Sequence, residues 1–319
     1  MSSTFAAHFG AFSHQHTPSE RGAELLSALN ESAEFSADHV NLNGCGLTSL
    51  PPSLRRCNKA HVFSLYDNQL TEIPDWLWDW ANLETLNLSA NQLTHLSADL
   101  RRLTALRMLD LGHNRLDMLP DVFSGFTHLK FLYLSNNRLT ALPNSMRHLS
   151  VLTYLNIADN GFTALPNWLC ELKNLQEVRA YNNALKSLPD HLGQLTNLRE
   201  LHMMKNALTM LPASLGECSQ LEQLMLQSNQ IACLPDSIGE LAALTELDLR
   251  FNQLSQLPEA LGQLQHLRSL DLRANALTSI PDSLASLPNL RKLDLRWNRM
   301  TALPAVFRQL EERGCLIYT

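Results

Sequence analysis

The chain has 319 residues, of which 45% are hydrophobic, and it carries a formal net charge of −6 at pH 7. An acidic chain without a basic run has no general attraction for nucleic acid or for an anionic membrane face, so we expect neither as a partner. No apolar stretch reaches 18 residues, and the first residues lack an apolar core with a basic flank. We therefore expect no membrane span and no signal peptide.

Residues 1–16 contain no acidic residue and show no period. A disordered tail is expected, because chain termini are commonly not held by the rest of the fold. An alternative interpretation is an address for secretion into a host cell. His14 and His16 could touch a metal ion, but two histidines without a third ligand predict no metal site.

Residues 17–36 are predicted to form a helical cap. Thr17 and Glu20 have the spacing of a capping box, and Pro18 stands in the first turn. An apolar face follows, made of Ala23, Leu25, Leu26 and Leu29. We expect this face to cover the open end of the structure that follows, because an uncovered end would attract other chains.

Residues 37–312 contain twelve repeats with a period of 23 residues. One position of the repeat holds asparagine, or cysteine in the first repeat: Cys45, Asn68, Asn91, Asn114, Asn137, Asn160, Asn183, Asn206, Asn229, Asn252, Asn275 and Asn298. An uninterrupted period of this length predicts a solenoid, in which each unit buries its apolar face only against its neighbours.

The repeat at 244–266 illustrates the local structure. Leu247 and Leu249 alternate with outward positions, as in a short strand, and Pro258 blocks continuation of the strand. The residues after Pro258 are expected to arc back as a helical or 3₁₀ segment. Stacked strands then form a parallel sheet, and Asn252 at the corner can bond backbone groups inside the turn.

The pattern L-x-x-L-x-L-x-x-N-x-L, followed in most repeats by Leu-Pro or Ile-Pro, resembles the leucine-rich repeat family. The resemblance implies an α/β leucine-rich repeat solenoid, a horseshoe with a parallel sheet on its concave face. The 23-residue form is similar to intracellular Ras-group-related repeat proteins and to the repeat modules of bacterial effectors. Two positions depart from the pattern: Ser97 replaces the proline, and Cys45 replaces the asparagine, a substitution common in this family.

Residues 313–319 are predicted to be a terminal capping strand, with Leu316 and Tyr318 at its inward positions. The six cysteines lack the clusters with which extracellular members of the family cap their ends, so we expect a reducing compartment. The expected location is the cytoplasm, or the cytoplasm of a host cell after secretion.

The sequence contains no enzyme signature. It lacks glycine-rich phosphate loops, the H-E-x-x-H and G-x-S-x-G motifs, protein kinase signatures and a Cys-x-Asp nucleophile. We therefore expect a chain that is not an enzyme and that binds no cofactor and no metal.

Partner binding is expected on the concave wall, where strand residues beside the buried leucines face solvent. The early repeats offer small polar groups there, such as Asn41, Ser64 and Asn87. The central repeats instead carry the predicted partner-binding residues: Met108, Phe131, Tyr133, Tyr154, Arg179, Tyr181, His202, Met204 and Met225. This composition is typical of interface cores, although the same side chains could simply pack between neighbouring strands.

The last repeats carry aspartate and arginine two residues apart: Asp248 with Arg250, Asp271 with Arg273, and Asp294 with Arg296. Opposite charges on neighbouring parallel strands can pair, so we expect this ladder to be a self-satisfied surface. Phe251 and Trp297 lie beside the ladder and favour contact with a partner.

We predict a protein-recognition module, a monomer that binds a partner protein on its concave face as a scaffold or a bacterial effector. An alternative is the substrate-recognition part of an enzyme, a ubiquitin ligase or a kinase, whose catalytic domain is not in this chain. A third class, a glycan-binding surface module, would require secretion and disulfide-bonded caps, of which the sequence shows no sign.

Overall fold

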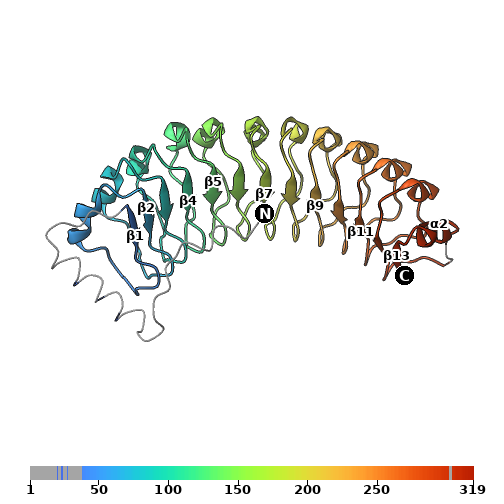
Figure 1. Ribbon diagram of the computed structural model, residues 1–319, viewed down its shortest axis with the longest axis horizontal. Coiled ribbons are helices and arrows are strands. Elements are labelled where there is room, and N and C mark those ends of the chain that lie inside the picture. Colours follow the sequence, from blue (N-terminus) through green and yellow to red (C-terminus); the bar gives the residue numbers. More distant parts are fainter. Residues whose placement is uncertain (1–19, 21–22, 24–26, 28–37, 302–303) are drawn as a thin grey trace.

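The computed structural model describes residues 20, 23, 27, 38–301 and 304–319. These residues form a curved solenoid with strands along its concave side and short helices along its convex side (Figure 1). The predicted tail lies outside the described residues, and so does nearly all of the predicted cap. No helix in the described part of the chain is long and apolar enough to cross a membrane.

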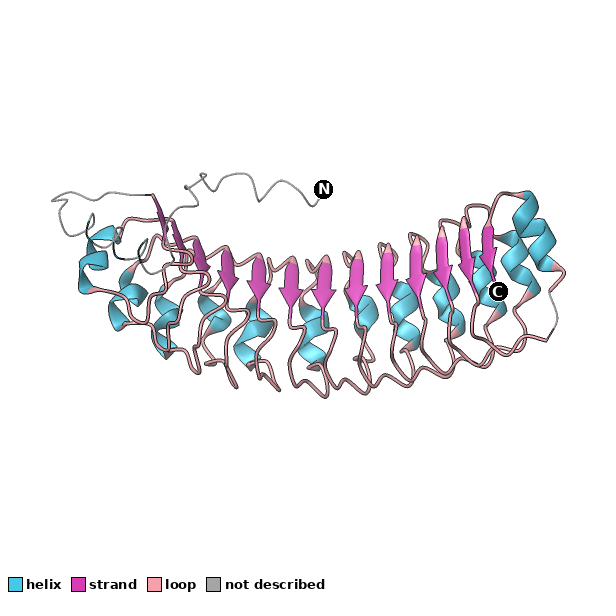
Figure 2. Ribbon diagram, turned by 90° about the horizontal axis from the view of Figure 1, so that it is seen from below, coloured by secondary structure: helices cyan, strands magenta, loops and turns pink. Residues whose placement is uncertain are grey.

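Thirteen strands form one sheet in the order of the chain, each parallel to the next (Figure 2). They are β1 His39–Asn41, β2 Val62–Ser64, β3 Thr85–Asn87, β4 Met108–Asp110, β5 Phe131–Tyr133, β6 Tyr154–Asn156, β7 Glu177–Arg179, β8 Glu200–His202, β9 Gln223–Met225, β10 Glu246–Asp248, β11 Ser269–Asp271, β12 Lys292–Asp294 and β13 Leu316–Tyr318. Because successive side chains of a strand point to opposite faces, the middle residue enters the core and its two neighbours face the concave side.

The return segments of the repeats are short helices. Eleven are 3₁₀ helices: η2 Pro52–Cys57, η3 Asp75–Asp79, η4 Ala98–Arg102, η5 Phe123–Gly125, η6 Asn144–His148, η7 Asn167–Glu171, η8 Leu192–Gln194, η9 Ala213–Glu217, η10 Asp236–Glu240, η11 Glu259–Gln263 and η12 Asp282–Ser286. The last is the α-helix α2, Val306–Glu312. This alternation of strand and return helix confirms the predicted α/β solenoid.

Proline precedes most of these helices and explains where the extended backbone ends. Pro258, at φ −70° and ψ 146°, stands before η11, for example. Its ring fixes φ, and it has no N–H group that would need a partner. At Ser97 the proline is missing, and the serine hydroxyl instead accepts a hydrogen bond from the Asp99 N–H at 3.2 Å. A side-chain cap therefore replaces the proline at this repeat.

The asparagine ladder ties each repeat to the one before it. The Asn252 amide donates to the carbonyls of Leu226 at 3.0 Å and Leu249 at 2.9 Å, and its oxygen accepts from the Ile231 N–H at 3.0 Å. The same bonds recur from Asn68 to Asn298, which confirms the predicted role of the ladder.

Cys45 heads the ladder beside β1, and among the described residues no strand before β1 offers a carbonyl for an amide to bond. Its buried thiol lies 3.6 Å from the Asn43 carbonyl oxygen. A small, weakly polar residue is therefore sufficient at this first position.

The last repeat departs from the predicted register. β13 pairs with β12 one residue beyond the 23-residue period, so that Leu316 lies opposite Lys292 and Ile317 opposite Leu293. Leu316 and Tyr318 are consequently exposed, and the prediction that they point inward is wrong. The additional residue falls in the repeat whose return segment is the α-helix α2 rather than a 3₁₀ helix.

Candidate functional site

The concave wall consists of three columns of outward residues that run across the strands. The first and second columns are the first and third residues of each strand, and the third column lies two residues further along the chain. In β7 these residues are Glu177, Arg179 and Tyr181. The strands lie side by side (Figure 2), and because neighbouring strands pair in register, each column continues from one repeat to the next.

All nine predicted partner-binding residues lie in these columns on β4 to β9, and all are half-buried. The first column holds Met108, Phe131 and Tyr154, the second holds Tyr133, Arg179, His202 and Met225, and the third holds Tyr181 and Met204. Each of the six strands contributes at least one of them. These nine residues are called the central patch below.

Aromatic contacts organise the first half of the central patch. Met108, Phe131 and Tyr154 are register partners on neighbouring strands. The rings of Tyr133 and Tyr154 pack with their centroids 4.8 Å apart and their planes 38° apart. The Arg179 guanidinium lies 5.9 Å from the Tyr154 ring centroid, close enough for a cation–π interaction. The structure therefore brings these five residues into one continuous surface.

Burial also affects the hydroxyl groups of this surface. It raises the pKa of Tyr154 to about 12, and it raises the pKa of Tyr133 as well. Both hydroxyls therefore remain protonated at neutral pH and can donate a hydrogen bond. A tyrosine with these properties offers a rigid apolar ring together with one polar contact.

Two glutamates that were not predicted from the sequence lie beside the central patch. Glu177 pairs with Arg179 on the same strand, and Glu200 pairs with His202 at 3.0 Å. Glu177 and Glu200 are themselves register partners across β7 and β8. The repeat period was the available signal, because Glu177 and Glu200 follow Tyr154 by one and two periods of 23 residues and so fall in the first column.

Glu177, Glu200 and His202 bring three potential metal ligands together. The ligand atoms of Glu177, Glu200 and His202 all lie within 4.8 Å of one another, and oxygen and imidazole donors of this kind suit several divalent metals. The Arg179 guanidinium opposes a metal ion here, because it already pairs with Glu177 and adds a positive charge.

The aspartate–arginine ladder pairs mainly within each strand rather than across strands. The arginine-to-aspartate distances are 3.2 Å in β10, 2.6 Å in β11 and 2.7 Å in β12. One cross-strand pair also occurs, between Arg273 and Asp294 at 3.4 Å. The ladder therefore satisfies its own charges, with a geometry that differs from the expected one.

The carboxyl groups of the ladder differ in acidity. Burial raises the pKa of Asp248 to about 6, against the opposing effect of the Arg250 backbone and charge. Burial also disfavours ionised Asp294, but hydrogen bonds from Arg296 and the charges of Arg273 and Arg296 outweigh it and lower its pKa. Asp294 therefore stays charged beneath its arginines.

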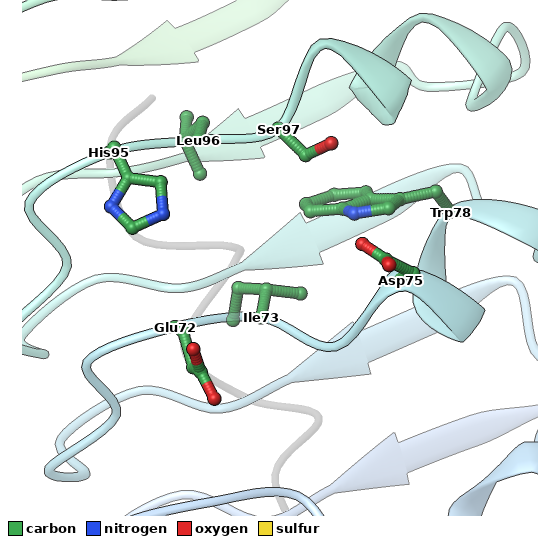
Figure 3. A pocket seen from close by; sticks show the side chains of 7 residues that line it. All are labelled: Glu72, Ile73, Asp75, Trp78, His95, Leu96 and Ser97. Carbon is green, nitrogen blue, oxygen red and sulfur yellow. The ribbon is translucent and has the colours of Figure 1, made fainter.

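A separate crease lies between the segments that follow β2 and β3, and it is lined by Glu72, Ile73, Asp75, Trp78, His95, Leu96 and Ser97 (Figure 3). It encloses about 290 Å³. Figure 3 shows the Trp78 indole beside Ser97, the residue that replaces the proline. Trp78 is fully buried, and its indole N–H has no hydrogen-bond partner in the described structure. No residue of the central patch lines this crease.

Stacked repeats with a parallel sheet on the concave side define the class of leucine-rich repeat solenoids. Comparison with known families leads to the same class. Residues 61–116, 82–139, 196–254 and 242–300 match the leucine rich repeat family, and residues 123–224 match the leucine-rich repeat region family. The chain belongs to the leucine-rich repeat family.

Solved structures extend this likeness. The chain is 30% identical to the leucine-rich repeat protein LIC12759 of Leptospira interrogans, over 88% of this chain and 83% of that one, with a TM-score of 0.62. It is also 30% identical to the ectodomain of the Arabidopsis thaliana receptor kinase GASSHO1/SCHENGEN3, with a TM-score of 0.69. This alignment includes 84% of the present chain but only 37% of the receptor chain.

The internalin InlF of Listeria monocytogenes, 21% identical, matches 94% of both chains with a TM-score of 0.70, which shows the fold alone. No curated protein matches the sequence.

Proposed function

We propose that the chain is a non-catalytic recognition module whose central patch holds a segment of a partner protein against the concave wall. The observation that supports this function is the change of wall chemistry along the solenoid. Mostly small polar groups line β1 to β3, with Val62 and Tyr66 as exceptions, whereas aromatic, methionine and arginine side chains are concentrated on β4 to β9. Interface cores are enriched in the second set of residue types.

The contacts within the central patch support the same function. Tyr133, Tyr154 and Arg179 are held by one another, so these three side chains lose little conformational freedom when a partner binds them. Packing between strands accounts for only part of their surface, because all three side chains remain partly exposed. Met204 and Met225 add adaptable apolar surface on the next strands.

Two similar structures were solved as complexes. One is the GASSHO1/SCHENGEN3 ectodomain with CASPARIAN STRIP INTEGRITY FACTOR 2. The other is PEPR1–AtPEP1, 29% identical with a TM-score of 0.70, which aligns over 85% of this chain and 43% of that one. Comparable solenoids are thus found bound to other molecules, which supports a binding role for this one.

In this proposal the chain acts as a scaffold or an effector in the cytoplasm of its own cell or of a host. The scattered cysteines of the sequence, without clusters at the ends, support a reducing compartment.

The test begins with capture of the partner on the immobilised chain and its identification by mass spectrometry. Binding of the purified partner is then measured by calorimetry for the chain and for a Tyr133→Ala, Tyr181→Ala variant. Removal of two anchors should cost about 2 kcal/mol or more of binding free energy, roughly a 30-fold rise in Kd. Folding stability should change little, because both side chains lie outside the core.

A Tyr66→Ala variant is the matched control, since Tyr66 is exposed on the wall outside the central patch. Its Kd should equal that of the unchanged chain. Equal loss of binding in both variants, or unchanged binding in the double variant, would contradict the proposed site.

A further inference from the structure

Two large apolar rings occupy a backbone position that normally excludes them. The residue before each ladder asparagine has a positive φ, and it is aspartate, asparagine, alanine, histidine, lysine or serine in most repeats. Among the described residues, the exceptions with large apolar rings are Phe251, at φ 56°, and Trp297, at φ 60°. A bulky side chain in this left-handed conformation is strained, and such strain is commonly retained where the side chain has a function.

These rings are not needed by the core. Phe251 is 49% exposed and Trp297 is 66% exposed. Their centroids lie 6.3 Å apart, on either side of the small residue Ala274 in the intervening repeat. The Arg296 guanidinium lies 5.9 Å from the Trp297 centroid and 5.2 Å from that of the exposed Tyr318. The structure thus forms an exposed platform, the C-terminal platform, from Phe251, Trp297, Arg296 and Tyr318.

The surroundings of the C-terminal platform are basic, although the whole chain is acidic. The segments 245–254, 268–277 and 291–300 contain seven lysines and arginines against four acidic residues. The arginines of the ladder also cover their carboxylates: the Arg296 side chain is 41% exposed and its partner Asp294 is 0% exposed. The charge presented to solvent is therefore mainly guanidinium, held in place by the aspartates beneath.

We propose that the C-terminal platform is a second interaction surface, which binds an acidic segment of a partner protein bearing an aromatic or large aliphatic anchor. The anchor packs on Phe251 and Trp297, and the flanking carboxylates bond to Arg296 and Arg250, whose side chains are the more exposed of the ladder arginines. Charge complementarity identifies the occupant as acidic. This surface lies outside the central patch and does not depend on the function proposed for that patch.

The test is selection of random twelve-residue peptides, displayed on phage, against the full chain. Enriched peptides should carry aspartate or glutamate beside an aromatic or large aliphatic residue. A synthetic copy of one such peptide is the probe, and its Kd is measured by fluorescence anisotropy. Phe251→Ala with Trp297→Ala should raise this Kd at least tenfold. The fold should be retained, because alanine already occupies this turn at Ala90 and Ala274.

A peptide with asparagine and glutamine in place of its acidic residues should also bind at least tenfold more weakly. The Tyr133→Ala, Tyr181→Ala variant should bind the original peptide normally. The inference is overturned if no peptide is enriched, if the enriched peptides are not acidic, or if the platform variant binds them unchanged. Peptides whose binding is weakened only in the Tyr133→Ala, Tyr181→Ala variant would support the central patch and contradict this second surface.

Analytical sedimentation of the unliganded chain tests whether the C-terminal platform instead binds a second copy of the protein. A monomer is expected at all concentrations. A dimer abolished by the platform substitutions would assign the surface to self-association instead and overturn the inference.

Discussion

Asn160→Leu is expected to lower the free energy of unfolding by about 3 kcal/mol or more, because it strands several buried backbone groups that each cost about 1–3 kcal/mol. The Asn160 amide donates to the carbonyls of Leu134, Ile157 and Ala158 at 3.0, 3.1 and 3.0 Å. Its oxygen accepts from the Leu139 N–H at 2.9 Å. Leucine has similar volume but can make none of these bonds.

Urea denaturation measures this change. The control is Asn144→Leu, the same substitution at an exposed position that begins η6. The control should unfold close to the unchanged chain. A denaturation midpoint for Asn160→Leu that equals the control would show that the ladder does not hold the repeats together.

Gly262→Ala is expected to destabilise the fold by about 1–3 kcal/mol, the usual effect of overpacking a close contact. A Cβ atom at Gly262 would lie 2.4 Å from the Ser283 carbonyl oxygen and 2.6 Å from the Ser283 Cβ. Both atoms belong to Ser283 in the neighbouring helix η12, so the two repeats would have to move apart. The same close approach to a carbonyl oxygen of the next repeat occurs at Gly193, Gly216 and Gly239.

The matched control for this glycine is Gly125→Ala. Gly125 also lies in a 3₁₀ helix, but a Cβ there would meet its nearest neighbour, the Thr104 methyl group, at 3.7 Å, an ordinary contact. Thermal unfolding should show a clear fall in Tm for Gly262→Ala and little change for the control. Similar Tm values for both variants would show that the close packing of η11 against η12 does not require glycine at position 262.

The repeat architecture could be predicted because each local signal agrees with the others. Leucine spacing, proline and asparagine recur with one period, and a corner asparagine has few other ways to satisfy a buried turn. The end of the chain was predicted less well. Leu316 and Tyr318 keep the spacing of inward residues, but β13 pairs with β12 one residue beyond the period, in the repeat that contains α2, and both side chains are exposed.

The candidate site could be predicted only as a set of columns. Alternation within a strand placed Tyr133, Tyr154 and Arg179 on the concave wall. It could not show that Glu177 pairs with Arg179, because side-chain conformations decide whether a charge bonds within its own strand or across to the next. For the same reason the pairing of the aspartate–arginine ladder was expected mainly across strands and is found mainly within them.

Site-specific photo-cross-linking shows directly whether the partner lies on the concave wall at the central patch. A photoreactive phenylalanine analogue is placed in turn at Tyr133, at Tyr181 and at the exposed convex residue Gln194. With the captured partner present, cross-links are expected from the first two positions and not from Gln194. Cross-linking from Gln194 alone would place the partner on the convex side and contradict the account.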